Sequence, residues 1–183
     1  MEIKIRNIKA TYDYAGEKVA LLCPPHPLMG GNRFDVRLGK ISDKLNSSRV
    51  STLIFDYDGY RGGFGEIEDA KLCIDFLKSR HSSISVIGYS FGSLVASNVA
   101  DLCDSAVYIS PLPSIDSIAF KDSKIPKFFV IARKDQFISL SESFMLFFKA
   151  TEPKDFIILD TDHFYFGKFD VLAEKIKDFL IRI

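Results

Sequence analysis

Hydrophobic positions along this chain follow two periods that alternate with each other. Short runs that are mainly apolar or rich in β-forming residues, typical of strands buried on both faces, occupy residues 19–23, 50–57, 84–88, 105–110, 127–132 and 156–159. Between them, apolar residues recur every three or four positions, and this spacing predicts amphipathic helices over residues 34–45, 67–77, 91–102, 140–150 and 169–183. Such alternation predicts a mostly parallel, doubly wound sheet with helices on both faces, a three-layer α/β/α architecture.

The N-terminal residues depart from this alternation. Residues 2–6 and 8–14 predict two short strands with no helix between them. We therefore expect an antiparallel hairpin added at one edge of the sheet. No internal repeat and no Pro/Gly-rich linker divides the sequence, so a single domain over residues 1–183 is expected.

The charge balance and the cysteines narrow the function classes. The chain has 24 Lys and Arg against 24 Asp and Glu, and this balance gives no electrostatic footprint for nucleic acid or an anionic membrane. Cys23, Cys73 and Cys103 lie far apart, and the three histidines do not cluster with them. These features argue against a disulfide scaffold or a structural metal site. Because the sequence also shows no signal-peptide pattern and no apolar run near the ~18 residues of a membrane span, we expect a cytoplasmic location.

The clearest chemical signal is a glycine-flanked serine. Gly88-Tyr89-Ser90-Phe91-Gly92 falls where a predicted strand meets a predicted helix, the position at which a GxSxG turn exposes a nucleophilic serine. The turn is tight, so the flanking residues must lack bulky side chains, and Gly88 and Gly92 meet that need. The N–H of Phe91, at the start of the helix, would then face a developing oxyanion.

A serine needs a base to become a nucleophile, and only three histidines are available. His81 precedes the strand at 84–88 and so falls at the amino end of the sheet, opposite Ser90. His26 and His163 each follow a strand and fall at the carboxyl edge, where chemistry collects in doubly wound sheets. His163 is the favoured base, although a loop histidine without catalytic role would give the same sequence.

The carboxylate that would orient this base is Asp135, three residues after the strand at 128–132 and again at the carboxyl edge. A helix cap or solvated loop charge is the alternative interpretation. Asp162 adjoins the histidine in sequence, where neighbouring side chains of an extended chain point apart, so we expect a capping role for it, and a structural one for Asp160. The resulting order Ser90, Asp135, His163 is that of the α/β-hydrolases.

The wider pattern is similar to the α/β-hydrolase superfamily over essentially the whole chain. The chain resembles in particular the small, lidless bacterial and archaeal hydrolases that carry an HPHPxxGG loop: residues 23–32 are Cys-Pro-Pro-His-Pro-Leu-Met-Gly-Gly-Asn, with Pro24 in place of the first histidine. Residues 55–60 resemble the FDYRGYG loop, with Asp58 in place of arginine. Ala132 replaces the glycine of the GxxD acid motif, and the DHF segment around the histidine is complete.

The resemblance implies a serine hydrolase that cleaves esters through an acyl-enzyme, with Ser90, His163 and Asp135 as its triad. No metal or cofactor is implied, and the expected partner is a small-molecule acyl substrate. The same triad also serves thioesterases, peptidases and acyltransferases. A non-catalytic binding protein of the same fold is a further alternative, which the departures at Pro24, Asp58 and Ala132 would allow.

The resemblance also implies an oxyanion hole formed by the Phe91 N–H and one N–H of the loop at 24–30. Proline has no N–H, which leaves His26, Leu28 and Met29 as donors. We favour Leu28, because the loop must reach back over the serine. The ring of His26 is expected to pack or hydrogen-bond locally rather than act as a base.

The length of one connection bears on substrate size. Many superfamily members insert a helical lid after the strand that ends near Ser110, but here residues 111–126 are too few for a folded lid domain. An open site favours small or short-acyl esters. Four apolar residues of this segment are expected either to line an apolar pocket or to pack in the core: Leu112, Ile115, Ile118 and Phe120. The sequence leaves the oligomeric state open.

Overall fold

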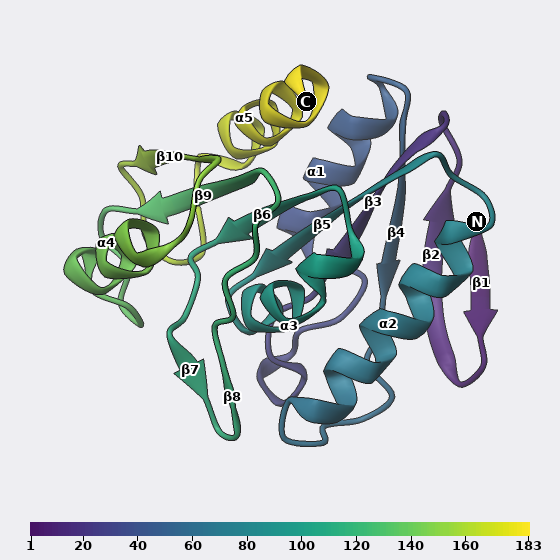
Figure 1. The fold of residues 1–183 in the computed structure, drawn as a ribbon, viewed down its shortest axis with the longest axis horizontal. Helices are drawn as coiled ribbons and strands as arrows, with labels where there is room; N and C mark the ends of the chain where they lie inside the picture. The colour runs from purple at the N-terminus through teal and green to yellow at the C-terminus, as the bar shows by residue number, and fades with distance from the viewer.

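Eight strands form one sheet in the computed structural model, which describes residues 1–183. Their order is β1-β2-β4-β3-β5-β6-β9-β10 (Figure 1). The strands are β1 (Glu2–Ile5), β2 (Ile8–Asp13), β3 (Lys18–Cys23), β4 (Val50–Phe55), β5 (Ser83–Tyr89), β6 (Ser105–Ile109), β9 (Lys127–Ala132) and β10 (Lys154–Leu159). Within this sheet β3, β4, β5, β6, β9 and β10 pair in parallel, whereas β1 and β2 form an antiparallel hairpin and β2 pairs antiparallel with β4. The predicted mixed sheet and its edge hairpin are confirmed.

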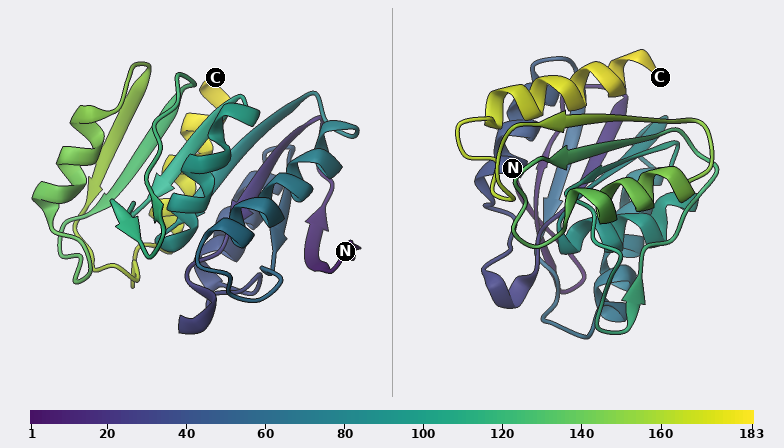
Figure 2. Two further views of the ribbon diagram at one scale, coloured as in Figure 1. Left: turned by 60° about the horizontal axis from the view of Figure 1, so that its bottom comes forward. Right: turned by 90° about the vertical axis from the view of Figure 1, so that its left-hand side faces the viewer.

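Helices cover both faces of this sheet. On one face lie α2 (Phe64–Lys78), α3 (Phe91–Val99) and α4 (Leu140–Lys149), and on the other lie α1 (Val36–Asn46) and α5 (Phe169–Arg182). The right-hand view of Figure 2 shows the strands between α5 above and α3 and α4 below. None of these helices is both long and apolar enough to cross a bilayer.

The sheet separates two apolar cores. Successive residues of one strand point to opposite faces, so Leu21 of β3 joins the core under α2, α3 and α4, and Leu22 joins the core under α1 and α5. Strands β4, β6 and β9 are buried along their whole length, which explains why their sequences are mostly apolar rather than alternating. Strand β10 lies at an edge and begins with exposed or half-exposed residues, including Lys154 and Asp155, so the sequence predicted only its last four residues, 156–159.

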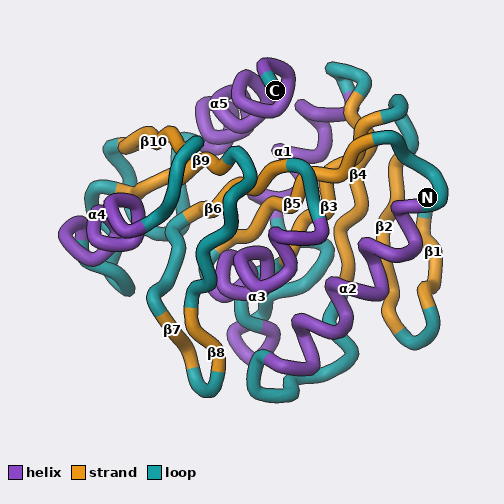
Figure 3. The backbone as a smooth tube through the Cα atoms, viewed as in Figure 1, coloured by secondary structure: helices purple, strands orange, loops and turns teal.

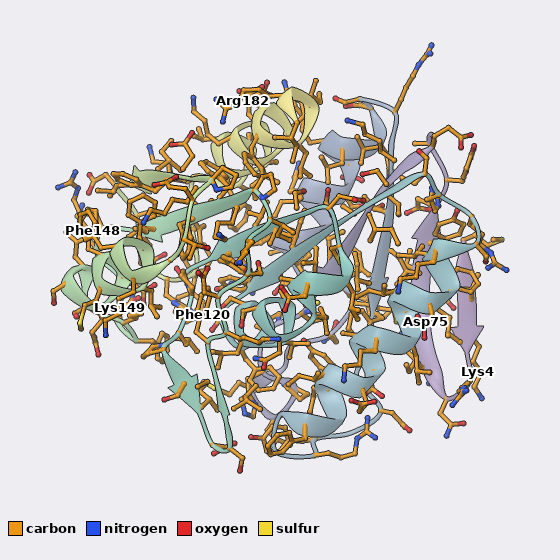
Figure 4. All side chains as sticks on the ribbon, viewed as in Figure 1. Lys4, Asp75, Phe120, Phe148, Lys149 and Arg182 are labelled. Carbon is orange, nitrogen blue, oxygen red and sulfur yellow. The ribbon has the colours of Figure 1, made fainter.

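The connection at 111–126 contains no lid domain. It forms a short hairpin that the sequence did not predict, β7 (Ser114–Ile115) and β8 (Ile118–Ala119), visible in Figure 3 as a projection beside α3. Two-residue strands are too short to show a hydrophobic period. Phe120, labelled in Figure 4, then returns to the core, where its ring lies 4.8 Å from that of Tyr108.

Candidate active site

The serine lies in a strained turn between β5 and α3. Ser90 has φ 55° and ψ −120°, a conformation that costs energy for any residue except glycine. A Cβ on Gly88 would lie 2.1 Å from the carbonyl oxygen of Gly92, and a Cβ on Gly92 would lie 2.1 Å from that of Cys23. Both glycines are therefore required for the close approach of strand, helix and the loop after β3.

The base and the acid reach this serine from two other strand ends. The Nε2 atom of His163, which follows β10, lies 3.0 Å from Ser90 Oγ. The Nδ1 atom of the same ring lies 2.7 Å from Asp135 Oδ2, at the end of β9. The structure thus brings the three sequence-predicted residues into one hydrogen-bonded row, as parallel strands that end at a common edge allow.

Asp135 is held in place by its own loop. Its side chain is only 1% exposed, and Oδ1 accepts hydrogen bonds from the N–H groups of Phe137 at 2.9 Å and Ile138 at 3.2 Å. Burial alone would raise the pKa of this carboxyl, but the hydrogen bonds from the His163 ring and the Phe137 N–H outweigh it and hold the pKa below the ordinary value. The cap interpretation and the acid interpretation of Asp135 are therefore compatible, because one carboxylate oxygen caps the loop and the other faces the histidine.

Three groups that the sequence reasoning missed fix the histidine. The main-chain carbonyl of His163 accepts a hydrogen bond from Tyr89 Oη at 2.8 Å. Its main-chain N–H donates to Gln136 Oε1 at 3.1 Å. Arg37 in turn donates to Tyr89 Oη at 3.0 Å. Tyr89 and Gln136 adjoin the predicted serine and acid in the chain, and that adjacency was the only sequence signal available for them.

The other two carboxylates have structural roles. Asp162 accepts a hydrogen bond from the Phe164 N–H at 3.0 Å and so caps the loop that carries the histidine. Asp160 pairs with Lys134 at 3.0 Å on the surface, and this pairing holds its pKa below the ordinary value. Neither carboxylate is hydrogen-bonded to the His163 ring.

The remaining histidines also bond locally. His81 lies at the amino end of the sheet, where Nε2 is 2.8 Å from Tyr12 Oη. The ring of His26 lies between Tyr60 and Phe91, at centroid distances of 4.6 and 4.9 Å. Neither ring is hydrogen-bonded to Ser90, so the histidine in contact with the serine is His163.

The choice of Leu28 as an oxyanion donor has to be corrected. Its N–H donates to Nδ1 of His26 at 3.2 Å, and its side chain is 72% exposed. The N–H of Met29 donates to the His26 carbonyl at 3.0 Å. Of the three candidates only the His26 N–H has no acceptor within the chain. The Phe91 N–H is free of intrahelical partners because Phe91 is the first residue of α3.

A cavity of about 330 Å³ opens above the serine. Its apolar walls come from the loop after β3, from β7 and the segment before it, and from the loops that carry the acid and the base: Met29, Leu112, Ile115, Phe137, Ile138 and Phe164. Leu112 and Ile115 thus line the cavity, whereas Ile118 and Phe120 pack into the core. No group of three or more His, Cys, Asp or Glu side chains is placed to hold a metal ion.

Comparison with known sequences gives one short match. No protein-family model matches this chain. Protein usf of Aquifex pyrophilus is 35% identical over 80 residues, which cover 39% of this chain and 35% of that protein. The chain therefore matches about a third of the length of this curated relative.

Comparison with solved structures gives matches over nearly the whole chain. An α/β serine hydrolase homologue from Coxiella burnetii has a TM-score of 0.86 at 20% identity, covering 97% of this chain and 95% of that one. A lidless α/β serine hydrolase from Xanthomonas campestris has a TM-score of 0.83 at 15% identity, covering 96% and 88%. Est1E from Butyrivibrio proteoclasticus has a TM-score of 0.82 at 16% identity, covering 100% and 97%. Likeness at this level of identity shows a common fold.

Proposed function

We propose that this chain, which has the α/β-hydrolase fold without a lid domain, is a serine hydrolase that cleaves small or short-acyl esters. One observation carries the proposal: the row Asp135–His163–Ser90 is hydrogen-bonded at 2.7 and 3.0 Å. The row ends at a serine in a strained turn, beside two main-chain N–H groups without acceptors. Ordinary packing does not require that combination, and nucleophilic acyl transfer does.

The proposed reaction proceeds in two halves. Ser90 Oγ attacks the acyl carbonyl carbon while His163 Nε2 takes the hydroxyl proton, and Asp135 stabilises the imidazolium that forms. The carbonyl oxygen becomes an oxyanion, which accepts hydrogen bonds from the N–H groups of Phe91 and His26, each worth about 3 kcal/mol. The C–O bond to the leaving alcohol then breaks, and His163 returns its proton to that oxygen. Water, activated by the same base, hydrolyses the acyl-enzyme.

The open cavity supports a small acyl group. Its volume of about 330 Å³ is at the low end for ligand pockets, and no lid domain covers it. One solved structure of Est1E holds ferulic acid, an acid small enough for a cavity of this class. We therefore assign the cavity to the acyl group and the ester bond of the substrate.

The direct test combines a probe with a substrate panel. A fluorophosphonate should label the protein once, at Ser90, as mapped by peptide mass spectrometry. p-Nitrophenyl acetate and butyrate should be hydrolysed faster than the matching thioesters or anilides. Preference for a thioester or an amide would reassign the substrate bond within the same chemistry. A protein that neither reacts with the probe nor turns over any of the three would contradict the proposal and favour a binding role.

The second oxyanion donor can be tested by removing a single N–H. His26 has φ −58°, which a proline ring also adopts, so His26→Pro deletes the N–H with little backbone strain. His26→Ala keeps the N–H but loses the same ring. We expect kcat of the proline variant on p-nitrophenyl acetate to be about 10²- to 10³-fold below that of the alanine variant. Equal rates in the two variants, with equal thermal stability, would show that this N–H plays no part.

A further inference from the structure

A row of aromatic side chains leads from the base to the surface. Phe137 and Phe164 line the cavity, and their ring centroids lie 4.7 and 5.7 Å from that of His163. The rings of Phe137 and Phe164 are 6.0 Å apart, Phe164 and Phe166 are 6.0 Å apart, and Phe166 and Phe169 are 6.3 Å apart. We call these four residues the aromatic track.

Three members of the track are exposed to solvent, which is unusual for phenylalanines in contact with one another. The exposed fractions are 55% for Phe137, 37% for Phe164 and 69% for Phe166. In the loop after β10 the side chains alternate, so that His163 and Tyr165 are buried at 4% and 0% while Phe164 and Phe166 face outward. Polar residues would suit those outward positions in a solvated loop, so exposed rings that continue the cavity indicate an apolar ligand.

The chemistry of the site decides which part of a substrate lies there. In the proposed reaction the acyl carbonyl is fixed by Ser90 Oγ and by the oxyanion donors of α3 and of the loop after β3. The leaving oxygen must lie within hydrogen-bond reach of His163 Nε2, because that atom protonates it. The track begins at the ring of that histidine. The alcohol portion of the ester is therefore the part directed along the track.

We propose that the aromatic track binds an apolar alcohol portion, so that the enzyme's substrates are short-acyl esters of apolar alcohols. This inference rests on the proposed function and deepens it. The cavity above Ser90 takes the acyl end, and the rings of Phe164, Phe166 and Phe169 cover one side of the alcohol chain. Burying one side of a methylene group contributes about half of its full transfer free energy, or roughly a two-fold gain in kcat/KM per methylene.

The test uses two substrate series kept below their solubility limits in water. Acetates of ethanol, butanol and octanol vary the alcohol, and p-nitrophenyl acetate, butyrate and hexanoate vary the acyl group. For the wild type, kcat/KM should rise by about ten-fold or more along the alcohol series. Because all members form the same acetyl-enzyme, kcat should converge where deacylation limits the rate. A flat or falling alcohol series in the wild type would overturn the proposal.

The variants locate the effect. Phe166→Ala should lower kcat/KM for octyl acetate about five-fold and leave ethyl acetate and the whole acyl series within two-fold, and Phe166→Leu should restore most of the loss. Phe148→Ala is the matched control, because Phe148 is 71% exposed but lies on α4 outside the cavity lining (Figure 4). Equal effects of Phe166→Ala on both series, or the same effect from Phe148→Ala, would overturn the proposal.

These outcomes separate the track from the catalytic function. Loss of the track's role leaves hydrolysis of ethyl acetate and labelling of Ser90 intact, whereas failure of the proposed function abolishes both.

The oligomeric state of wild type and Phe166→Ala is measured at assay concentration by light scattering. We expect wild type and Phe166→Ala to have the same oligomeric state, whether monomeric or oligomeric. Dissociation of an oligomer on Phe166→Ala would assign the exposed rings to a second copy of the chain and overturn the substrate proposal.

Discussion

Replacing Ser90 with alanine is expected to lower kcat/KM for p-nitrophenyl acetate by about 10⁴-fold or more. The substitution removes the only hydroxyl within hydrogen-bond reach of His163 Nε2, at 3.0 Å, and with it the atom that forms the acyl-enzyme. The oxyanion donors and the cavity remain, so a weak rate above that of water should persist. Fluorophosphonate labelling should disappear entirely.

The same substitution should leave the fold intact. Alanine accepts the positive φ of Ser90 no less readily than serine does, and the Nε2 atom faces an open cavity where water replaces the lost hydroxyl. The free energy of unfolding, measured by thermal denaturation, should therefore change by no more than about 1 kcal/mol. Ser117→Ala is the matched control, since Ser117 is exposed in the turn between β7 and β8. Full activity in a folded Ser90→Ala protein would contradict the proposed mechanism.

The layered fold was predictable because burial on both faces leaves a strong trace in sequence. The strands β4, β6 and β9 have no exposed residues, so their sequences are mostly apolar and show no regular alternation with exposed polar residues. The edge strand β10 and the short hairpin β7–β8 carry polar residues or too few residues to show a period. Their limits depend on which neighbours cover them, and that is a property of the tertiary structure.

The candidate triad was predictable for a related reason. A serine between glycines, an aspartate and a histidine each follow a parallel strand, and the ends of those strands share one edge. The His26 N–H, which we propose as the second oxyanion donor, was not predictable, because its availability depends on the three-residue turn Pro27–Met29. That turn uses the N–H groups of Leu28 and Met29 for its own hydrogen bonds and leaves His26 free.

The supporting contacts of the histidine lie beyond sequence reasoning altogether. Arg37 at the start of α1 and Tyr89 at the end of β5 are 52 residues apart in the chain. Only the folded sheet brings them together and directs Tyr89 Oη to the His163 carbonyl. The same holds for the loop after β3, where the carbonyl of Pro24 accepts a hydrogen bond at 2.9 Å from Tyr57 Oη, 33 residues further along the chain.

Replacing Asp135 with asparagine is expected to lower kcat by about 10⁴-fold while preserving the fold. The asparagine oxygen can still cap the N–H groups of Phe137 and Ile138, which now lie 2.9 and 3.2 Å from Oδ1. Its NH₂ group then faces His163 Nδ1 and donates to it. This reverses the hydrogen bond, places the ring proton on Nε2, and leaves no lone pair there to accept the proton of Ser90.

The matched control and the pH profile make this prediction specific to one carboxylate. Asp162→Asn alters the carboxylate adjacent to the histidine in sequence, but the new oxygen can still accept from the Phe164 N–H, so kcat should stay within a few-fold of wild type. Because hydrogen bonds hold the Asp135 pKa below its ordinary value, Asp135 stays ionised as pH falls through the ordinary titration range of aspartate. Its contribution to folding stability is fully present above the ordinary aspartate pKa and is lost as pH falls from that value through the lowered folded-state pKa. Because the native carboxylate stays ionised in the ordinary titration range of aspartate, wild-type activity should not fall with protonation of Asp135 in that range, as checked by kcat/KM against pH. If Asp162→Asn lowered kcat as much as Asp135→Asn, the assignment of the orienting role to Asp135 would be wrong.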